Sequence, residues 1–372
     1  MLRHSRPPHR NVLAAAALLL VLAGCPPPPA VRHPPVEEAP AAPMPAPRPI
    51  PAVRLPPPEP ALPEPAPPEA HQVLGQSGEF VILRAGPADT LASLAARYLG
   101  DPQRWWVIAD FNRTRRVSPG QEVVIPLGPL NPPGVRTDGY QTVPILCYHR
   151  FGDEQARMVV SAEAFEAQMR YLAENDYRVV PLAALADFLE GKSPLPERAV
   201  VLTMDDGYRS NYQLAFPILK RYRFPATIFV YTDFVGARAA LAWPQMREMI
   251  DSGLVDIQPH SKAHSNLAYP GVSEDPDAFR ERVAAEISVP TELLRRNLGV
   301  ALHTFAYPYG DAGELAMAEL RGAGYRMAAT VQSGGNPFYA YPYLLRRTMV
   351  YGEDDLAAFR RKLDVFRPQS LK

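Results

Sequence analysis

The chain contains few cysteines, no excess of charge and no long apolar segment. Two cysteines, Cys25 and Cys147, occur in 372 residues, and Lys+Arg and Asp+Glu are equal at 39 each. The balanced charge gives no reason to expect a nucleic acid or a strongly acidic partner. An apolar run near the N-terminus, Val12–Ala23, is too short to span a bilayer by itself. No internal repeat is visible.

The N-terminus has the order of an export signal. Three arginines precede the apolar run, which ends in Leu22-Ala23-Gly24-Cys25. This ending resembles the lipobox of bacterial lipoproteins, and the resemblance implies a signal peptide over residues 1–24 and a lipid on Cys25 that holds the protein at a membrane. Pro26 follows in place of Asp, so we expect an exported lipoprotein of the outer membrane that faces the periplasm. The alternative is an ordinary signal peptide or membrane anchor with an incidental cysteine.

Lipidation of Cys25 would leave Cys147 without a partner for an internal disulfide. Cys147 lies in the apolar run Val143–Cys147. We therefore expect a buried core thiol rather than a nucleophile.

Proline is the abundant residue. Of the 44 prolines, 20 fall in the 45 residues from Pro26 to Ala70. Such a stretch cannot bury a core and favours extended polyproline II structure. We assign residues 25–78 to a linker, which at about 3.1 Å per residue reaches on the order of 100 Å or more.

Residues 79–127 predict a small domain of strand, helix, helix and strand. Phe80–Leu83 is strand-like, Asp89-Thr90 can cap a helix, Pro102–Asn112 suggests a second helix, and Val123–Pro126 a closing strand. This order resembles the LysM module, which implies binding of glycans that contain N-acetylglucosamine, peptidoglycan included. The alternative is a degenerate copy with a structural or docking role, and Trp105 and Trp106 do not decide between the two. The matching residues are Gly86, Asp89-Thr90-Leu91, Leu94-Ala95, Asn112, Pro119-Gly120-Gln121 and Ile125-Pro126.

A short Pro/Gly linker over residues 128–140 leads into residues 141–372, where strand and helix patterns alternate. The alternation predicts an α/β fold with a largely parallel sheet, and about seven strand–helix units suit a (β/α) barrel or a distorted barrel. In such a fold the active site lies at the carboxyl ends of the strands. The predicted strands are 143–148, 178–180, 199–204, 226–231, 255–259, 304–307 and 327–331, and the predicted helices are 162–174, 212–223, 244–252, 278–298, 314–323 and 354–363.

Two adjacent carboxylates, Asp205 and Asp206, follow the apolar run Ala199–Leu202. Burying an unpaired carboxylate is costly, and a divalent cation removes the cost. His260 and His264 lie about fifty residues further on, and one Asp with two His makes a three-ligand site with an open position for water. The other Asp is then free to act as a base, which is typical of a metal-dependent hydrolase.

Three segments, Thr203–Gly207, His260–His264 and Phe305–Gly310, together resemble the polysaccharide deacetylases of carbohydrate esterase family 4. The resemblance implies that Asp206, His260 and His264 bind the metal and that Asp205 is the general base for the attacking water. It also implies that the backbone N–H of Tyr309 helps to hold the oxyanion, although Tyr309 can equally be an aromatic residue of the rim. We expect zinc as the metal, with cobalt, nickel and iron as alternatives.

The chain departs from that family pattern in the general acid. The family's late Leu-x-His motif is missing, since no histidine follows His303. His149, in Leu146–Phe151, is the replacement, because this segment resembles the first motif of the poly-N-acetylglucosamine deacetylase branch. The alternatives are that local backbone groups satisfy His149, or that His303 competes, but His303 precedes its strand and should lie at the opposite end of the sheet.

A second departure concerns the residue that orients the base. The usual arginine of the third motif is Ala306 here. We expect Arg346 or Arg347 to substitute, although either can be an ordinary surface charge.

Together these features predict a metal-dependent N-deacetylase that removes acetyl groups from N-acetylglucosamine units of an exopolysaccharide. A peptidoglycan N-acetylglucosamine deacetylase is the first alternative. An O-acetyl glycan esterase and a catalytically silent glycan-binding lipoprotein are the others.

Overall fold

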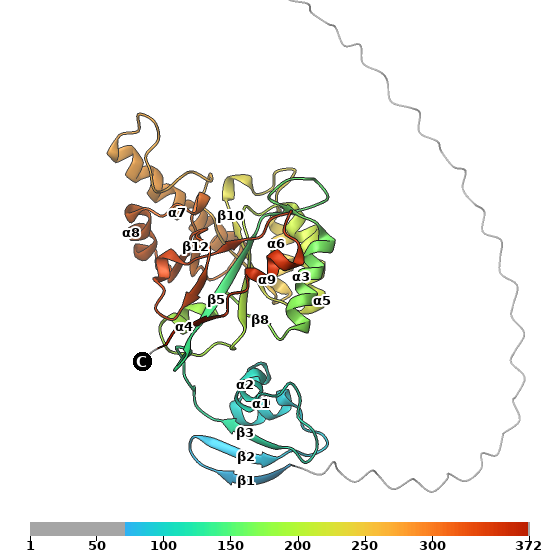
Figure 1. Ribbon diagram of the computed structural model, residues 1–372. Coiled ribbons are helices and arrows are strands. Elements are labelled where there is room, and N and C mark those ends of the chain that lie inside the picture. Colours follow the sequence, from blue (N-terminus) through green and yellow to red (C-terminus); the bar gives the residue numbers. More distant parts are fainter. Residues whose placement is uncertain (1–70, 371–372) are drawn as a thin grey trace, which may run out of the picture. The chain divides into compact units, whose positions relative to one another are not determined.

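The computed structural model describes residues 71–370 (Figure 1). The predicted signal peptide, the lipidation of Cys25 and the proline-rich stretch up to residue 70 lie outside the described residues. Between residues 71 and 370, none of the helices combines the length and the apolar composition that crossing a bilayer requires.

The first described elements form a small antiparallel sheet with two helices. Its strands are β1 (Gln72–Gln76), β2 (Phe80–Arg84) and β3 (Glu122–Pro126), in the order β1-β2-β3, and its helices are α1 (Leu91–Leu99) and α2 (Trp105–Asn112), with the 3-10 turn η1 (Pro102–Arg104) between them. The predicted order of strand, helix, helix and strand is confirmed. The predicted linker over residues 25–78 extends too far, because β1 pairs with β2 along residues 72–76.

Polar side chains fix the ends of these two helices. Thr90 caps α1, because its hydroxyl accepts from the N–H of Ser93 at 3.0 Å and the Ser93 hydroxyl accepts from the N–H of Thr90 at 2.9 Å. The Asn112 amide joins α2 to β3 through two hydrogen bonds with the backbone of Val124. These contacts give Thr90 and Asn112 a structural role within the small domain.

The main sheet is parallel through its centre. Four long strands lie in the order β11-β10-β9-β5, and the short β15 pairs in parallel with β5. Their bounds are β5 (Gly139–Tyr148), β9 (Ala199–Met204), β10 (Ala226–Val230), β11 (Val255–Pro259) and β15 (Thr348–Met349). Of these strands, β5 and β10 are labelled in Figure 1.

Short strands complete this sheet. β4, β14 and β16 pair antiparallel with β5, β8 pairs with β9, and β12 and β13 form a separate parallel pair. Within residues 71–370 the ladders therefore do not join into one closed ring, and the predicted α/β barrel is a distorted one. β4 and the start of β5 lie inside the predicted linker 128–140, which is wrong there. The bounds are β4 (Val135–Arg136), β6 (Arg150–Phe151), β7 (Val159–Val160), β8 (Arg178–Val179), β12 (Thr304–Ala306), β13 (Met327–Ala329), β14 (Gly335–Pro337) and β16 (Phe366–Pro368).

Helices alternate with these strands as predicted, apart from α4, which the sequence pattern did not indicate. A π-helical turn over Asn211–Ala215 leads into α5. The bounds are α3 (Ala162–Glu174), α4 (Ala184–Leu189), α5 (Phe216–Tyr222), α6 (Trp243–Asp251), α7 (Pro276–Leu298), α8 (Glu314–Gly322) and α9 (Leu356–Arg361).

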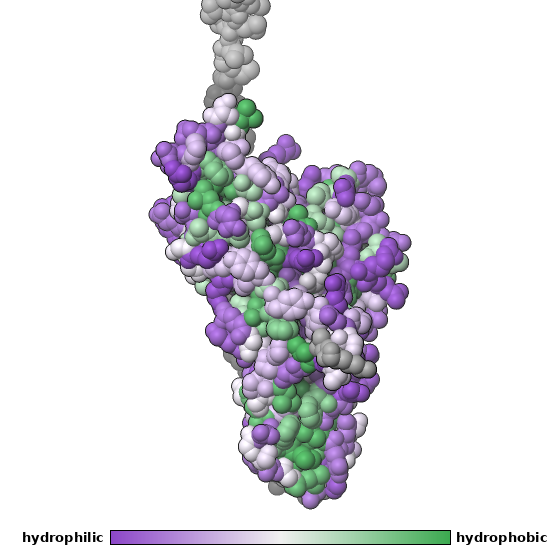
Figure 2. Space-filling model, turned by 60° about the vertical axis from the view of Figure 1, so that its left-hand side comes forward, coloured by the Kyte–Doolittle hydropathy of each residue, from purple (hydrophilic) through white to green (hydrophobic). Residues whose placement is uncertain are grey.

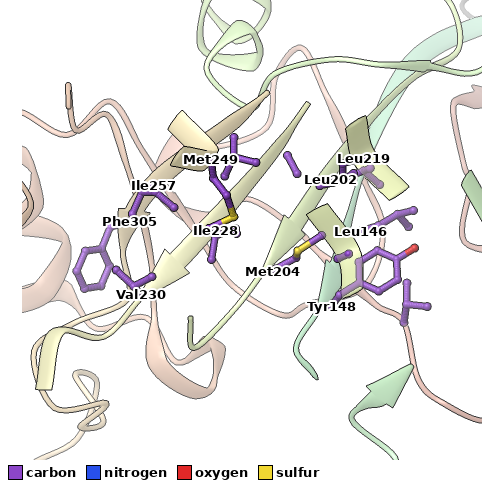
Figure 3. Packing of buried hydrophobic residues seen from close by; sticks show 14 of the residues in the cluster. Leu146, Tyr148, Leu202, Met204, Leu219, Ile228, Val230, Met249, Ile257 and Phe305 are labelled. Atoms are coloured by element: carbon purple, nitrogen blue, oxygen red, sulfur yellow. The ribbon is translucent and has the colours of Figure 1, made fainter. Parts of the chain in front are cut away.

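The sheet buries both of its faces, which explains why its strands are continuously apolar. Along β9, Val200 and Leu202 belong to one hydrophobic cluster, and Ala199 and Val201 belong to another. Successive side chains of a strand point to opposite faces, so apolar residues at every position require a cover on each side. Figure 3 shows the first cluster, in which residues of α5 and α6 pack on residues of β5, β9, β10 and β11.

The surface is polar over most of the face seen in Figure 2, and hydrophobic residues gather at its lower end. The small sheet exposes Val73, Leu74 and Ile82, each 40% or more accessible. Most of the other exposed large apolar side chains are tyrosines and leucines, and single exposed residues of this kind are ordinary on a protein surface.

Candidate active site

Three parallel strands of the central sheet end at the same edge, with β10 between the second and the third, and each is followed by a polar side chain there. β5 is followed by His149, β9 by Asp205 and Asp206, and β11 by His260. The register holds these ends level, since the Asp205 N–H donates to the Tyr148 carbonyl at 2.9 Å. The predicted site residues of three distant segments thus meet at the carboxyl ends of the strands.

Asp205 is buried against a single arginine. Its carboxylate, 1% exposed, accepts two hydrogen bonds from Arg347, at 2.6 Å from Nη1 and 2.7 Å from Nη2. Burial raises the pKa of the Asp205 carboxyl, but the positive charge and the hydrogen bonds of Arg347, with a smaller contribution from His260, outweigh burial and hold that pKa well below its usual range. Asp205 is therefore ionised at neutral pH.

Arg347 rather than Arg346 contacts the predicted base. Arg347 is 0% exposed, and its Nε donates to the Thr330 carbonyl at 2.8 Å, which fixes the plane of the guanidinium. Arg346 is exposed, and its closest side-chain bond reaches the Ser333 carbonyl at 3.4 Å. Of the two arginines that the sequence left open, only Arg347 is placed to orient Asp205.

Asp206, His260 and His264 form a compact set of ligand atoms, all within 4.8 Å of one another. The Asp206 Oδ1 lies 3.3 Å from His264 Nε2 and 3.7 Å from His260 Nε2. Burial raises the pKa of Asp206, but the hydrogen bond from His264 and the nearby His260 together outweigh burial, so that the net pKa lies below its usual value.

The surroundings of His260 suit a metal. Its Nδ1 lies 2.8 Å from the carbonyl oxygen of Ala306, which can only accept a hydrogen bond. Nδ1 therefore carries the proton, and the lone pair of Nε2 is directed at Asp206. An imidazole fixed in this way by a backbone carbonyl is typical of metal ligands, and one carboxylate with two imidazoles fits zinc and related ions.

Several site residues adopt a left-handed backbone that residues other than glycine rarely occupy. The φ angles of Asp206, His264 and Tyr309 are 71°, 59° and 63°. Ser261, between the two histidines, has φ 77°. Such strain is typical of functional sites, where the surrounding fold holds the chain in place.

Tyr309 lies in the turn Pro308–Gly310 and is 61% exposed. Its ring packs edge-on against His264, with 4.7 Å between the ring centroids. The ring is therefore part of the wall of a cavity beside the ligand set, as expected for an aromatic residue of the rim, and the role of the Tyr309 N–H stays a prediction.

His149 lines one cavity together with Asp205, Asp206 and the two histidines of the ligand set. Its Nδ1 is buried and makes no hydrogen bond among residues 71–370. The predicted alternative, a histidine satisfied by local backbone groups, therefore does not hold for this atom. His303 lies elsewhere, paired with Asp256 at 2.9 Å near the amino end of β11, as predicted.

A cavity of about 440 Å³ joins these residues. The sequence indicated Tyr309 but not the other tyrosines or the methionines of its wall, because single residues in separate loops form no spacing pattern. Tyr208, which directly follows the Asp-Asp-Gly segment, was the one with a visible signal. The lining residues are His149, Arg150, Met158, Asp205, Asp206, Tyr208, His260, His264, Tyr307, Tyr309, Gly310, Val331, Met349 and Tyr351.

Cys147 is buried, as predicted, and its Sγ lies 3.5 Å from Asp205 Oδ2. Burial raises the pKa of the thiol well above its usual value. The thiol is therefore protonated and is not a nucleophile at neutral pH.

Known proteins share this domain. The family model described as polysaccharide deacetylase matches residues 192–328. The poly-β-1,6-N-acetyl-D-glucosamine N-deacetylase of Escherichia coli strain K12 is 32% identical over 226 residues, which cover 51% of this chain and 34% of that protein. YxkH of Bacillus subtilis strain 168, a polysaccharide deacetylase by name, is 30% identical over 217 residues, which cover 58% of this chain and 74% of that protein.

A solved structure has the same architecture. IcaB from Ammonifex degensii superposes with a TM-score of 0.54 at 27% identity, over 60% of this chain and 97% of that one. The chain spans only about a third of the length of the E. coli relative. It covers most of YxkH and of the IcaB structure, so this chain belongs to the polysaccharide deacetylase family.

Proposed function

We propose that the protein is a metal-dependent N-deacetylase that removes acetyl groups from N-acetylglucosamine units of an exopolysaccharide of the poly-β-1,6 type. One observation carries the proposal. A buried, ionised Asp205 held by Arg347 lies beside a three-ligand set, and His149 faces the same cavity. A binding protein has no use for a second carboxylate fixed next to a metal set.

The substrate follows from the relatives. The name of the E. coli relative specifies poly-β-1,6-N-acetyl-D-glucosamine, and relatives from Staphylococcus aureus, 25% identical, have the same name. His149, which follows β5, belongs to the segment that resembles this branch. A polymer linked in this way is therefore the substrate that we assign to the cavity.

The residues of this chain divide the reaction between them. Asp205 takes a proton from the attacking water, and Arg347 keeps the carboxylate charged and oriented for that step. His149 donates a proton to the leaving amine, for which its unpartnered Nδ1 or the opposite ring nitrogen is available. The Tyr309 N–H stabilises negative charge on the carbonyl oxygen.

Asp206, His260 and His264 would hold the metal, and we assign zinc, with cobalt, nickel and iron as alternatives for the same ligands. A bound divalent metal supplies Lewis acidity, which lowers the pKa of water and polarises the acetamide carbonyl. The three side chains fix the position of that charge relative to Asp205, whose Oδ2 lies 3.9 Å from His260 Nε2.

Acetate release tests the function. The purified protein is offered β-1,6 and β-1,4 N-acetylglucosamine oligomers, whole peptidoglycan and an O-acetylated xylan, with Asp205→Asn as the control. We expect metal-dependent release from the β-1,6 oligomers that the substitution abolishes. Release from peptidoglycan alone would assign the protein to the cell wall, and release only from O-acetylated glycans would make it an esterase.

The remaining assignments concern where the reaction takes place. We infer a lipid on Cys25 and a position at the outer membrane facing the periplasm, and binding of peptidoglycan by the LysM-like segment 79–127. The order of strands and helices in that segment supports the last point. Pull-down with purified peptidoglycan tests it, and a protein that stays in the supernatant would leave the segment a structural role.

A further inference from the structure

The two histidine ligands lie on one loop, and a charged residue from a distant helix holds that loop. Glu286 is 4% exposed in the middle of α7. Its Oε2 accepts from the N–H groups of both Lys262 and Ala263, each at 2.9 Å. Its Oε1 accepts from the Ser265 hydroxyl at 2.8 Å.

A carboxylate is unusual among the buried residues of α7. The other buried residues of this helix are Val283, Ile287, Pro290, Thr291 and Leu294. A buried carboxylate is strongly unfavourable unless hydrogen bonds compensate for its lost hydration. The three bonds to the histidine loop supply that compensation, so the charge of Glu286 is directed at the loop and not at α7 itself.

The other contacts of the loop do not replace these bonds. The Ser261 carbonyl accepts from the Thr232 N–H at 3.2 Å, and the Lys262 carbonyl accepts from the Asp233 N–H at 2.9 Å. The segment that follows β10 therefore holds carbonyl groups of the loop and none of its N–H groups. The N–H of His264 is bound within the loop by the Ser261 hydroxyl at 2.9 Å. Glu286 accepts from the N–H groups of Lys262 and Ala263, which lie in the segment that joins the two histidines.

The loop also needs an external support. Ser261 and His264 have φ angles of 77° and 59°, which side chains other than glycine adopt at a cost. A strained segment relaxes unless its surroundings fix it. If it relaxed, His264 would move relative to His260, and the ligand atoms would separate.

We propose that Glu286 is a positioning residue for the metal centre, which sets the spacing between His260 and His264 by binding the backbone between them. This role of Glu286 rests on the proposed metal-dependent function. Removal of a partner that orients metal ligands weakens metal binding by about 10–100-fold. Glu286 acts on the backbone rather than on an imidazole, and we expect an effect within the same range.

Zinc binding to the purified, metal-free protein tests this, by competition with a chelating dye. Glu286→Leu, which has no acceptor, should bind zinc about 10–100-fold more weakly. Glu286→Asp, which keeps the charge but is one methylene shorter, should also bind more weakly. Glu286→Gln keeps an oxygen for the two N–H groups and should be closest to the unchanged protein.

Thr291→Val is the matched control. Thr291 is buried on the same helix and bonds to Tyr325 at 2.6 Å, away from the loop. The Thr291→Val substitution should lower the melting temperature and leave the zinc affinity unchanged. The proposal is overturned if Glu286→Leu binds zinc as tightly as the unsubstituted protein does; if the leucine variant does not fold, Glu286→Asp takes its place in this comparison. It is also overturned if Thr291→Val loses as much zinc affinity as the Glu286 variants. If the unsubstituted protein binds no zinc, the proposed function itself fails.

Discussion

A single ion pair decides how Asp205 behaves. Arg347 and Asp205 are both buried, and two short hydrogen bonds join them. Without the arginine, burial would favour the neutral acid, which cannot accept a proton. The pair therefore affects stability and catalysis through the same contact, and substitutions can separate the two effects.

Arg347→Met should destabilise the fold at pH 7. Removing one partner of a buried pair leaves an uncompensated charge, which costs about 3–5 kcal/mol. The exposed neighbour provides the control, since Arg346→Met should change the free energy of unfolding by less than about 0.5 kcal/mol. Urea unfolding measures both, and equal effects of the two variants would contradict the assignment of Arg347.

The same variant should alter the pH dependence of activity. In the unchanged protein the pKa of Asp205 lies well below its usual range, so the base stays ionised into acidic solution. In Arg347→Met the main group that opposes burial is gone, so the pKa of Asp205 rises and the acid limb of kcat/KM moves to higher pH. Arg347→Lys keeps a positive charge and should move the limb less. A lower plateau with an unmoved limb would mean that Arg347 acts through geometry alone.

His149 should matter most when the leaving group needs a proton. General acids contribute about 10²–10⁴-fold, so His149→Asn should lower kcat on acetylated oligomers by that order. On 4-nitrophenyl acetate, whose leaving group departs without protonation, the loss should be much smaller. His303→Asn, remote from the cavity, should keep its activity on both substrates. Equal losses on the two substrates would remove His149 from the role of acid.

At the scale of elements, turns after the strands set the shape of the site. The turn at Pro308–Gly310 follows β12 and approaches the chain at Val331, which follows β13. Gly310 has φ 77°, and a Cβ there would lie 2.6 Å from the Val331 nitrogen. The close approach of these two segments requires glycine.

Gly310→Ala should therefore be strongly destabilising. The left-handed backbone alone costs a residue with a Cβ about 1–2 kcal/mol, and the clash with Val331 adds to it. Gly322→Ala is the control, because Gly322 ends α8 and has no atom within 4 Å of an added Cβ. Thermal melts should show a loss for the first and a small gain, roughly 0.5–1 kcal/mol, for the second. A Gly310→Ala variant as stable as the unchanged protein would show that the turn can move.

The central elements were predictable because burial on both faces makes strands continuously apolar. β9 was predicted at its observed bounds, Ala199–Met204, and with it the position of Asp205 and Asp206. β14 and β16 were not predicted, since each is three residues long and ends in proline, which strands disfavour. β1 was missed because it follows the proline-rich stretch and contains Gly75, where the pairing with β2 is irregular.

The choice between Arg346 and Arg347 could not be made from the sequence. Adjacent residues near a strand point to opposite faces, so one of the two must point inwards. Which one depends on the register of β15 against β5, where Thr348 pairs with Leu146. That register is a tertiary property, and the same reason kept Glu286 from being recognised.

At the scale of the whole molecule, the proposed lipid on Cys25 would determine where the enzyme works. If Cys25 bears the lipid, Cys25→Ala should move the protein from the membrane fraction to the soluble fraction of cells, with unchanged activity on short oligomers in extracts. Fractionation followed by immunoblotting measures this. A variant that stays with the membrane would favour the alternative of an ordinary membrane anchor.

Strand β5 gathers partners from both ends of the domain. It begins at Gly139, yet it pairs with β14, β15 and β16, the last at Phe366–Pro368. The pairing of Arg347 with Asp205 is also long-range, since 142 residues separate the two along the chain. A growing polypeptide therefore has the three proposed metal ligands long before it has Arg347, the partner of Asp205. A chain cut short before Arg347 would have these ligand residues but would lack the arginine that we expect to keep Asp205 charged.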